Sequence, residues 1–306
     1  MRTSKQITMA VLVATIVGAG CSKKDEPYQA RTTESQPTAR VTPASITDLP
    51  HSTPPVAGPV SFADGEAAYN AGNYTEATKV FEQYTGQRPE NAWGHFMLGL
   101  SAWKSGDLQK AETALEDALR IDPEHLKSLV NLSRVLLDEQ RFDDAQMRLT
   151  AAGQIDPNSA EVHRLLGRTY KGQGKVDDAV TAYRRAIELD SEDAWSMNNL
   201  GLLFLEQGRT DDALPLLARA VQLKKDVSVF HNNLGMALEH TGRFGAAAAE
   251  YKSALTADPK YAKAEKNLTR VEAVKSTSEE PFDLEAMAGR LVEQTQNAVV
   301  DKTPKQ

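Results

Sequence analysis

The chain has 306 residues, of which a quarter are charged, and its formal net charge is -7 at pH 7. The charges are mixed in sign and form no basic run, which argues against nucleic acid as a partner. An acidic chain of this kind is expected to stay soluble and to repel other anions.

Residues 1–20 are typical of a secretory signal. Arg2 and Lys5 give a positive start, residues 7–17 form an apolar run, and residues 18–20 are small. These three features in this order mark a segment that directs export. The apolar run is too short to cross a bilayer as a helix, which takes about 20 residues.

Cys21, the single cysteine of the chain, follows this segment directly. The placement resembles a bacterial lipoprotein signal, in which the cysteine is lipidated and becomes the mature N-terminus. Gly18 departs from that pattern, which prefers a large apolar residue there. The resemblance implies a lipid-anchored protein of the bacterial cell envelope, facing the periplasm. The alternative is an ordinary exported protein with an incidental cysteine.

Residues 21–60 are predicted to be a tether that begins at the lipidated cysteine. The segment holds seven prolines among Thr, Ser and charged residues, and it has no periodic apolar pattern. Such composition predicts disorder. A chain of this length reaches roughly 35 Å as a coil, or about 120 Å as a polyproline helix.

A period of 34 residues organises the middle of the chain. The sequence Asn-Asn-Leu-Gly at 198–201 recurs at 232–235, and the period gives six copies in all. Every copy has an alanine in its second half, a small residue twelve positions earlier, and a turn residue seven positions after the small one. In the order of the copies these are Ala77, Ala111, Ala145, Ala179, Ala213 and Ala247; Gly65, Gly99, Ser133, Gly167, Gly201 and Gly235; and Gly72, Gly106, Gln140, Gly174, Gly208 and Gly242. A fixed period with these features indicates an array of two-helix units.

Each half of a copy is predicted to be an amphipathic helix, because apolar and small residues recur at helical spacing. In copy five, Leu200, Gly201 and Phe204 mark the first half, and Ala213 and Leu217 mark the second. The glycine between the halves lets the chain reverse direction. The small residues predict a close approach of the two helices. Since one pair cannot bury its apolar stripe alone, the copies are expected to stack.

This pattern resembles the tetratricopeptide repeat family, whose order of aromatic, Leu-Gly, aromatic, Ala, aromatic, Ala and Pro is matched position by position. The final proline occurs four times and is replaced in copies four and five: Pro89, Pro123, Pro157, Ser191, Lys225 and Pro259. The resemblance implies an all-α solenoid at 61–275, with six helix pairs and a closing helix. Their expected ranges are 58–91, 92–125, 126–159, 160–193, 194–227, 228–261 and, for the closing helix, 262–275. In copy one Asp64 replaces the expected leucine, so its first helix is expected to be short or solvated.

The tail at 276–306 begins with a break in the pattern. Residues 282–299 then show apolar residues at helical spacing, which predicts an amphipathic helix with Asp283 as its N-cap. Two alternatives are open here. The tail is either mobile and only partly folded, or a helix that docks onto the array or onto a partner.

Motifs for catalysis are missing. The sequence has no phosphate-binding glycine loop, no His-Glu-x-x-His, no cysteine pair and no nucleophile elbow. We therefore expect neither an enzyme nor a cofactor or metal. His95, His163 and His231 share one repeat position, but with helices packed about 8–10 Å apart their rings lie too far apart for one metal ion. We interpret them as packing residues between repeats.

The family resemblance implies that the first helix of each repeat lines a concave groove, with its second, fifth, sixth, ninth and twelfth residues facing a ligand. Four asparagines occupy the sixth position: Asn131, Asn199, Asn233 and Asn267. An amide offers a donor and an acceptor, so these residues could pair with a peptide backbone. The arrangement is similar to the asparagine ladder of O-GlcNAc transferase repeats, with a gap at Leu165. The alternative is that each asparagine only bonds to a neighbouring repeat.

Basic residues flank that gap. Five of them are predicted to converge on the groove, where they could hold carboxylates of a partner: Lys127, Arg134, Arg164, Arg168 and Lys171. The alternative is a solvated charged face in which Glu161 and Asp138 are the local partners.

Aromatic residues lie toward the N-terminal end of the array. Trp93, Phe96 and Trp103 share the expected concave side, and exposed aromatics are common interface anchors. Copy one could instead cover them. The sequence as a whole favours a non-enzymatic scaffold or adaptor of the cell envelope that binds peptide segments of partners. An accessory lipoprotein for polysaccharide export or cell-wall glycan handling is the alternative.

Overall fold

The computed structural model describes residues 59–274 and 282–291. All described residues belong to one compact unit, which lies within His51–Gln306. The expected signal, Cys21 and residues 21–58 of the predicted tether lie outside the described part. No helix within the described residues is long and apolar enough to cross a membrane.

The described unit is built of helices. A helix of residues 284–291, here called the C-terminal helix, follows thirteen others, which are α1 (Phe62–Asn70), α2 (Tyr74–Gln87), α3 (Ala92–Ser105), α4 (Leu108–Ile121), α5 (Leu126–Asp138), α6 (Phe142–Ile155), α7 (Ala160–Gly172), α8 (Val176–Leu189), α9 (Ala194–Glu206), α10 (Thr210–Leu223), α11 (Ser228–His240), α12 (Phe244–Ala257) and α13 (Ala262–Glu272). These are the six predicted pairs and the predicted closing helix. The all-α solenoid is therefore confirmed.

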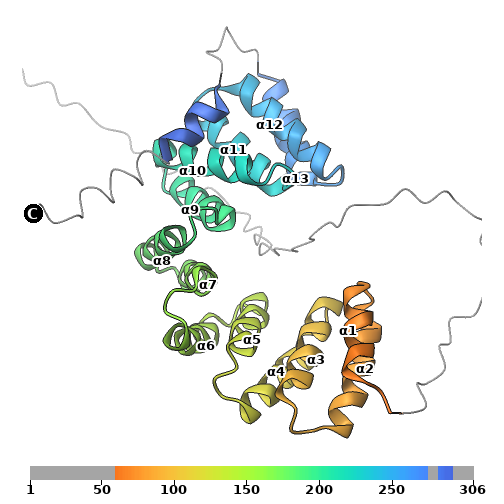
Figure 1. Cartoon of the computed structure of the whole chain (residues 1–306). Helices are drawn as coiled ribbons and strands as arrows, with labels where there is room; N and C mark the ends of the chain where they lie inside the picture. Colours follow the sequence, from red (N-terminus) through yellow and green to blue (C-terminus); the bar gives the residue numbers. More distant parts are fainter. Residues whose placement is uncertain (1–58, 275–281, 292–306) are drawn as a thin grey trace, which may run out of the picture. The chain divides into compact units, whose positions relative to one another are not determined.

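The helices form two layers along the array (Figure 1). Each helix packs on the next one in sequence, and each odd-numbered helix from α1 to α11 also contacts the next odd-numbered helix. Among the described helices, the backbone of no even-numbered helix comes as close to that of the next even-numbered one, and α2, α4 and α6 meet through long side chains, in the ion pairs Lys110–Glu82 and Arg148–Glu116. Since the odd helices are the more closely spaced, they form the inner face of the unit, and the even helices form its outer face.

The turn between the helices of each pair requires a left-handed residue. Five of the six turns use glycine, and the sixth uses Gln140 at φ 60°. A Cβ atom makes this conformation costly by about 1–2 kcal/mol, because it comes too close to the following carbonyl oxygen. Copy three therefore carries local strain that the other copies avoid.

Replacing Gln140 by glycine is expected to stabilise the protein by about 0.5–1 kcal/mol, because the relief of strain exceeds the added entropy of the unfolded chain. The Gln140 side chain is exposed, so little contact is lost. Urea unfolding measures the effect, with Gly106→Ala (φ 91°) as the opposite control. A less stable Gln140→Gly variant would contradict the expectation.

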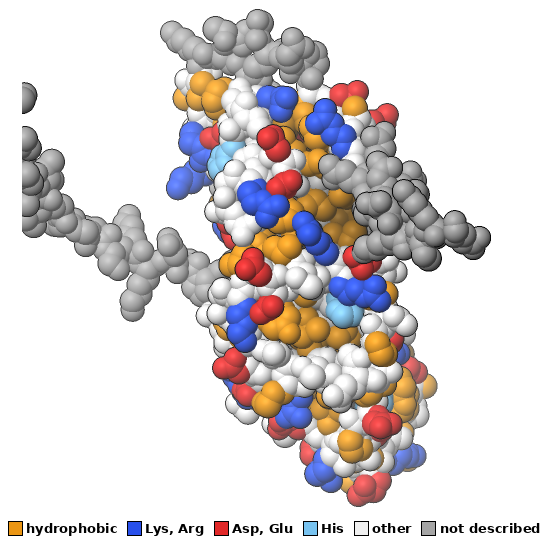
Figure 2. All heavy atoms as spheres, turned by 90° about the vertical axis from the view of Figure 1, so that its left-hand side faces the viewer, with side chains coloured by type: hydrophobic (Ala, Val, Ile, Leu, Met, Phe, Trp, Pro, Cys, Tyr) orange, Lys and Arg blue, Asp and Glu red, His pale blue; other side chains and the backbone are white. Residues whose placement is uncertain are grey.

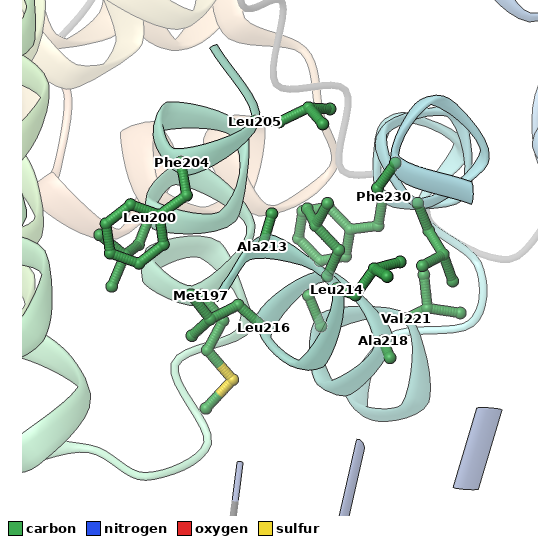
Figure 3. Close-up of a cluster of buried hydrophobic side chains, with 14 of the residues drawn as sticks. Met197, Leu200, Phe204, Leu205, Ala213, Leu214, Leu216, Ala218, Val221 and Phe230 are labelled. Carbon is green, nitrogen blue, oxygen red and sulfur yellow. The ribbon is translucent and has the colours of Figure 1, made fainter. Parts of the chain in front are cut away.

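The predicted close approach within each pair is present. All six repeated alanines are fully buried, and Ala213 lies between α9 and α10 in Figure 3. At Gly201, a Cβ atom would stand 2.7 Å from Cγ of Leu217 and 3.3 Å from the carbonyl oxygen of Ala213. The small residues are thus required by the packing of the pair.

The two ends of the array match their predictions. Helix α1 has nine residues, shorter than the other first helices, and Asp64 forms a capping box with Ser61. These hydrogen bonds lower the pKa of the Asp64 carboxyl. At the other end, α13 packs on α12 and α11, which closes the stack.

The C-terminal helix is docked on the array. Oδ1 of Asp283 accepts a hydrogen bond from the backbone N–H of Ala286 at 2.9 Å, which confirms the predicted N-cap. Ala288 and Leu291 are buried in the same cluster as residues of α9, α10 and α11. In Figure 1 this helix lies next to α10. Of the two alternatives for the tail, the structure has the docked helix; residues 292–306 lie outside the described part.

The sequence of α10 is adapted to a covered outer face. Pro215 and Ala218 are buried, whereas the residues at the same repeat positions in the other second helices are exposed: Lys79, Thr113, Met147, Thr181 and Ala249 for the first position, and Glu82, Glu116, Thr150, Arg184 and Lys252 for the second. Buried apolar residues at positions that are otherwise exposed, and mostly polar, indicate that a further element covers them. On the face of the unit seen in Figure 2, acidic, basic and hydrophobic side chains are interspersed.

Candidate functional site

The candidate site lies on the inner face, where the odd helices place the residues predicted from the sequence. All four asparagines, all five basic residues and all three aromatic residues stand on α3, α5, α7, α9, α11 or α13. Their surroundings differ, however, and decide which of them are available to a ligand.

The asparagines bond mainly to one another. Nδ2 of Asn233 donates to Oδ1 of Asn198 at 2.9 Å, and Nδ2 of Asn267 donates to Oδ1 of Asn232 at 2.9 Å. In each case the sixth residue of one first helix binds the fifth residue of the preceding one. Only 5% of Asn233 is exposed, so its predicted place facing a ligand is wrong. For Asn233 the structure instead has the alternative arrangement, in which the asparagine bonds to a neighbouring repeat.

Asn131 and Asn199 lie in different settings. Nδ2 of Asn131 donates to the carbonyl of Lys127 in its own helix at 2.8 Å. Asn199 is partly exposed and lies at the end of the chain of amides, with its Oδ1 3.5 Å from Nδ2 of Asn198. A ligand role for Asn131, Asn199 and Asn267 stays a prediction.

Four of the five basic residues are paired with carboxylates of the same chain. Each pair joins neighbouring first helices, with Asp193 as the N-cap of α9: Arg134 with Glu161, Arg164 with Asp193 (2.9 Å), Arg168 with Asp138 (3.8 Å) and Lys171 with Glu206 (2.8 Å). The pairs form because stacking brings an acidic residue of a neighbouring first helix, or of its N-cap, against each of the four. These pairs match the alternative of a charged face with local partners, and a role of the four basic residues in holding carboxylates of a partner stays a prediction.

The Arg164 pair is held most firmly. The side chain of Asp193 is only 2% exposed, and its carboxylate also accepts hydrogen bonds from the backbone N–H and the hydroxyl of Ser196. A buried carboxylate needs its cation, since a lone buried charge is costly. Arg164 thus stabilises the junction of two repeats.

Lys127 is the exception among the five. Its side chain is exposed, and Nζ lies 5.0 Å from the centre of the Trp93 ring. Within the described ranges it has no carboxylate partner in an ion pair. A cation over an indole face contributes about 0.5–1 kcal/mol at an exposed site, so Lys127 is positioned by Trp93 and its charge remains uncompensated.

Trp93 stands at the mouth of a concavity of about 600 Å³ on the inner face. It is 48% exposed, and edge contacts with Phe96 (5.6 Å) and His125 (4.7 Å) fix its ring. The lining is mostly aromatic and apolar and comes from α1, α2, α3 and α5: Phe62, Glu66, Tyr69, Asn70, Tyr84, Asn91, Trp93, Phe96, Met97, Leu100 and Lys127. We call it the aromatic pocket.

The other two predicted aromatic residues have different surroundings. Phe96 is buried but forms part of the pocket wall. Trp103 is half-buried, and its Nε1–H donates to Asp138 at 2.9 Å. Copy one therefore does not cover Trp93; it completes the pocket around it. Sequence reasoning missed Phe62, Tyr69 and Tyr84, although the concentration of aromatic residues in copies one and two was a signal for them.

The three repeated histidines are packing residues between repeats, as predicted. Nε2 of each lies at hydrogen-bonding distance from the carbonyl oxygen six residues earlier: 3.0 Å for His95 and Pro89, 3.1 Å for His163 and Pro157, and 2.9 Å for His231 and Lys225. Burial alone would lower the pKa of His231, but its hydrogen bonds to Glu250 and to that carbonyl outweigh burial and raise it. No group of side chains within 59–274 or 282–291 has the makeup of a metal site.

Comparison with known proteins agrees with this geometry. Profiles described as tetratricopeptide repeat match residues 62–125, 102–169, 164–228 and 198–262. No curated protein matches the chain.

Three solved structures illustrate the likeness in fold. The Cut9–Hcn1 hetero-tetramer of the APC/C matches with a TM-score of 0.62 at 17% identity, over 68% of this chain and 41% of that chain. This chain thus spans less than half of that one. A tetratricopeptide repeat protein from Parabacteroides merdae gives 0.58 at 14% identity, over 68% and 81%. TTC0263 from Thermus thermophilus gives 0.52 at 21% identity, over 60% and 100%.

At these identities the solved structures show the fold alone. The profiles cover more than half of the chain. The part that they match is the part that has the helix pairs, the period of 34 residues and the inner face of first helices. The chain belongs to the tetratricopeptide repeat family.

Proposed function

We propose that this protein is a non-enzymatic scaffold that binds segments of partner proteins on the inner face, with the aromatic pocket as the anchor site. Tetratricopeptide repeats generally serve as protein-binding scaffolds, and the Cut9–Hcn1 structure is that of an assembly of proteins. The observation that carries the proposal is the half-exposed, rigidly held Trp93 beside the aromatic pocket.

The physical reason is the cost of exposing such a residue. A large aromatic side chain left in water next to an apolar hollow gains free energy when a partner covers it. Trp is among the residues that contribute most to binding when buried at an interface. The other predicted anchors offer less, because Phe96 is buried, Trp103 is bonded to Asp138, and most of the basic residues are paired.

Replacing Trp93 by alanine is expected to weaken capture of a partner at least tenfold, which corresponds to a loss of at least about 1.4 kcal/mol, as expected for an anchor residue. The measurement is capture from a cell-envelope extract with the full chain as bait. Trp195→Ala is the matched control, because Trp195 packs against Phe230 at 4.8 Å in another repeat. Equal capture by wild type and Trp93→Ala would refute the pocket as the anchor.

The place of the protein in the cell is part of the proposal. We infer a lipid anchor at Cys21 and a tether that leaves the repeats free in the periplasm, from the sequence of residues 1–60. Cys21→Ser is expected to move the protein from the membrane fraction to the soluble fraction. If the wild type is already soluble after fractionation, the anchor is refuted.

A glycan is the competing ligand, since aromatic platforms with nearby amides also suit sugars. Few amide side chains at the pocket are available to hydrogen-bond a sugar. Both amide atoms of Asn91 are already near partners, Tyr84 Oη and the N–H of Gly94, which leaves Asn70. Binding of soluble cell-wall fragments that is lost in Trp93→Ala, with no protein captured, would favour the glycan reading.

A further inference from the structure

Two charged side chains at the aromatic pocket differ in one respect from the other four basic residues predicted on the inner face. Glu66 and Lys127 both line the pocket, both are exposed, and neither forms an ion pair with another residue in the described part of the chain. The other predicted basic residues of this face have carboxylate partners across the repeat junctions. An uncompensated acid and base thus share one apolar hollow.

These two charges stand on opposite sides of Trp93. Glu66 is on α1, Trp93 on α3 and Lys127 on α5. Helix α3 contacts both α1 and α5, and those two do not contact each other. With neighbouring helices about 8–10 Å apart, α1 and α5 are roughly 16–20 Å apart. An extended chain covers that span in about five or six residues at roughly 3.3 Å each.

We propose that the aromatic pocket takes an extended peptide segment with a large aromatic or apolar side chain between a basic and an acidic residue. The basic residue lies against Glu66, the apolar side chain enters the pocket beside Trp93, and the acidic residue meets Lys127. The two charged residues are about five positions apart in the segment. This inference rests on the proposed function and specifies the chemistry of its ligand.

The charge pattern can be tested by exchange. Three short fluorescent peptides share a central Phe and differ only in two residues, one on each side of it and about five positions apart: Lys and Glu, Lys and Lys, or Glu and Glu. Fluorescence anisotropy with the purified full chain measures their dissociation constants. Because a peptide can bind in either direction, the number and sign of the flanking charges are tested and their order is not.

The wild type is expected to bind the Lys and Glu peptide about threefold more tightly than either of the others at low salt, with the difference shrinking as salt is added. Lys127→Glu is expected to prefer the Lys and Lys peptide, and Glu66→Lys the Glu and Glu peptide. Both residues are exposed, so circular dichroism should show unchanged folding.

Trp93→Ala separates this inference from the proposed function. This variant is expected to weaken the binding of all three peptides by a similar factor, since all three make the same apolar contact with Trp93. If Trp93→Ala does so but the exchanges at Glu66 and Lys127 leave the order of affinities unchanged, the charge pattern is refuted and the pocket stands. If no peptide binds and Trp93→Ala still captures partners as the wild type does, the pocket itself is refuted.

Discussion

Removal of residues 276–306 is expected to lower the free energy of unfolding by about 2–4 kcal/mol, although this segment lies beyond the repeats. The C-terminal helix places Ala288 and Leu291 in the core cluster, with Leu284 and Met287 partly buried against it. Burying one large apolar side chain contributes about 1.5–3 kcal/mol, part of which offsets the entropy of ordering the segment. Truncation would also expose Pro215 and Ala218 to water.

Urea unfolding of the truncated and full chains measures this effect. Hydrogen exchange should place the loss in copies five and six, because repeats interact only with their neighbours. An unchanged midpoint would mean that the C-terminal helix adds nothing to the stability of the array.

A single substitution on α10 tests the same contact without shortening the chain. Ala218→Arg places a charge under the C-terminal helix and is expected to cost about 1–3 kcal/mol, since a buried charge without a partner is unfavourable. Thr150→Arg is the matched control at the same position of copy three, where the side chain is exposed. That control should change stability by less than about 0.5 kcal/mol. Equal effects of the two variants would show that nothing covers α10.

Ala213→Leu is expected to destabilise the protein by about 1–3 kcal/mol, because the added atoms overpack the junction of α9 and α10. Ala213 is fully buried, and its carbonyl lies in the wall against which Gly201 packs. The flexible Leu217 side chain can move, but the backbone of α10 cannot do so without separating the pair.

Ala67→Leu in α1 is the control, because Ala67 is exposed and an added side chain there meets no packed neighbour. Thermal and urea unfolding should show a loss for Ala213→Leu and a change below about 0.5 kcal/mol for Ala67→Leu. If Ala213→Leu unfolds like the wild type, the small residues are not what sets the spacing of the two helices.

The sequence by itself determined the architecture of this protein. Helix pairs, their ends, the turn glycines, the short first helix with Asp64, the closing helix and the cap at Asp283 all follow from local chemistry and from a period of 34 residues. The packing role of His231 followed from the same period. These features were predictable because each depends on neighbours in sequence or on the equivalent residue in the next copy. The signals of the repeat also occur in several copies, which makes the pattern easy to recognise.

Only the tertiary structure decided which inner-face residues are available to a partner. The sequence placed Asn233 and Arg164 on the inner face. It did not show that Asn233 bonds to Asn198 at 2.9 Å and that Arg164 pairs with Asp193 at 2.9 Å. The same holds for the pocket that Phe62 and Tyr84 complete around Trp93, and for the outer face of α10 that the C-terminal helix covers. A side chain's partner depends on the stagger and rotation between stacked repeats, and periodicity alone does not determine those.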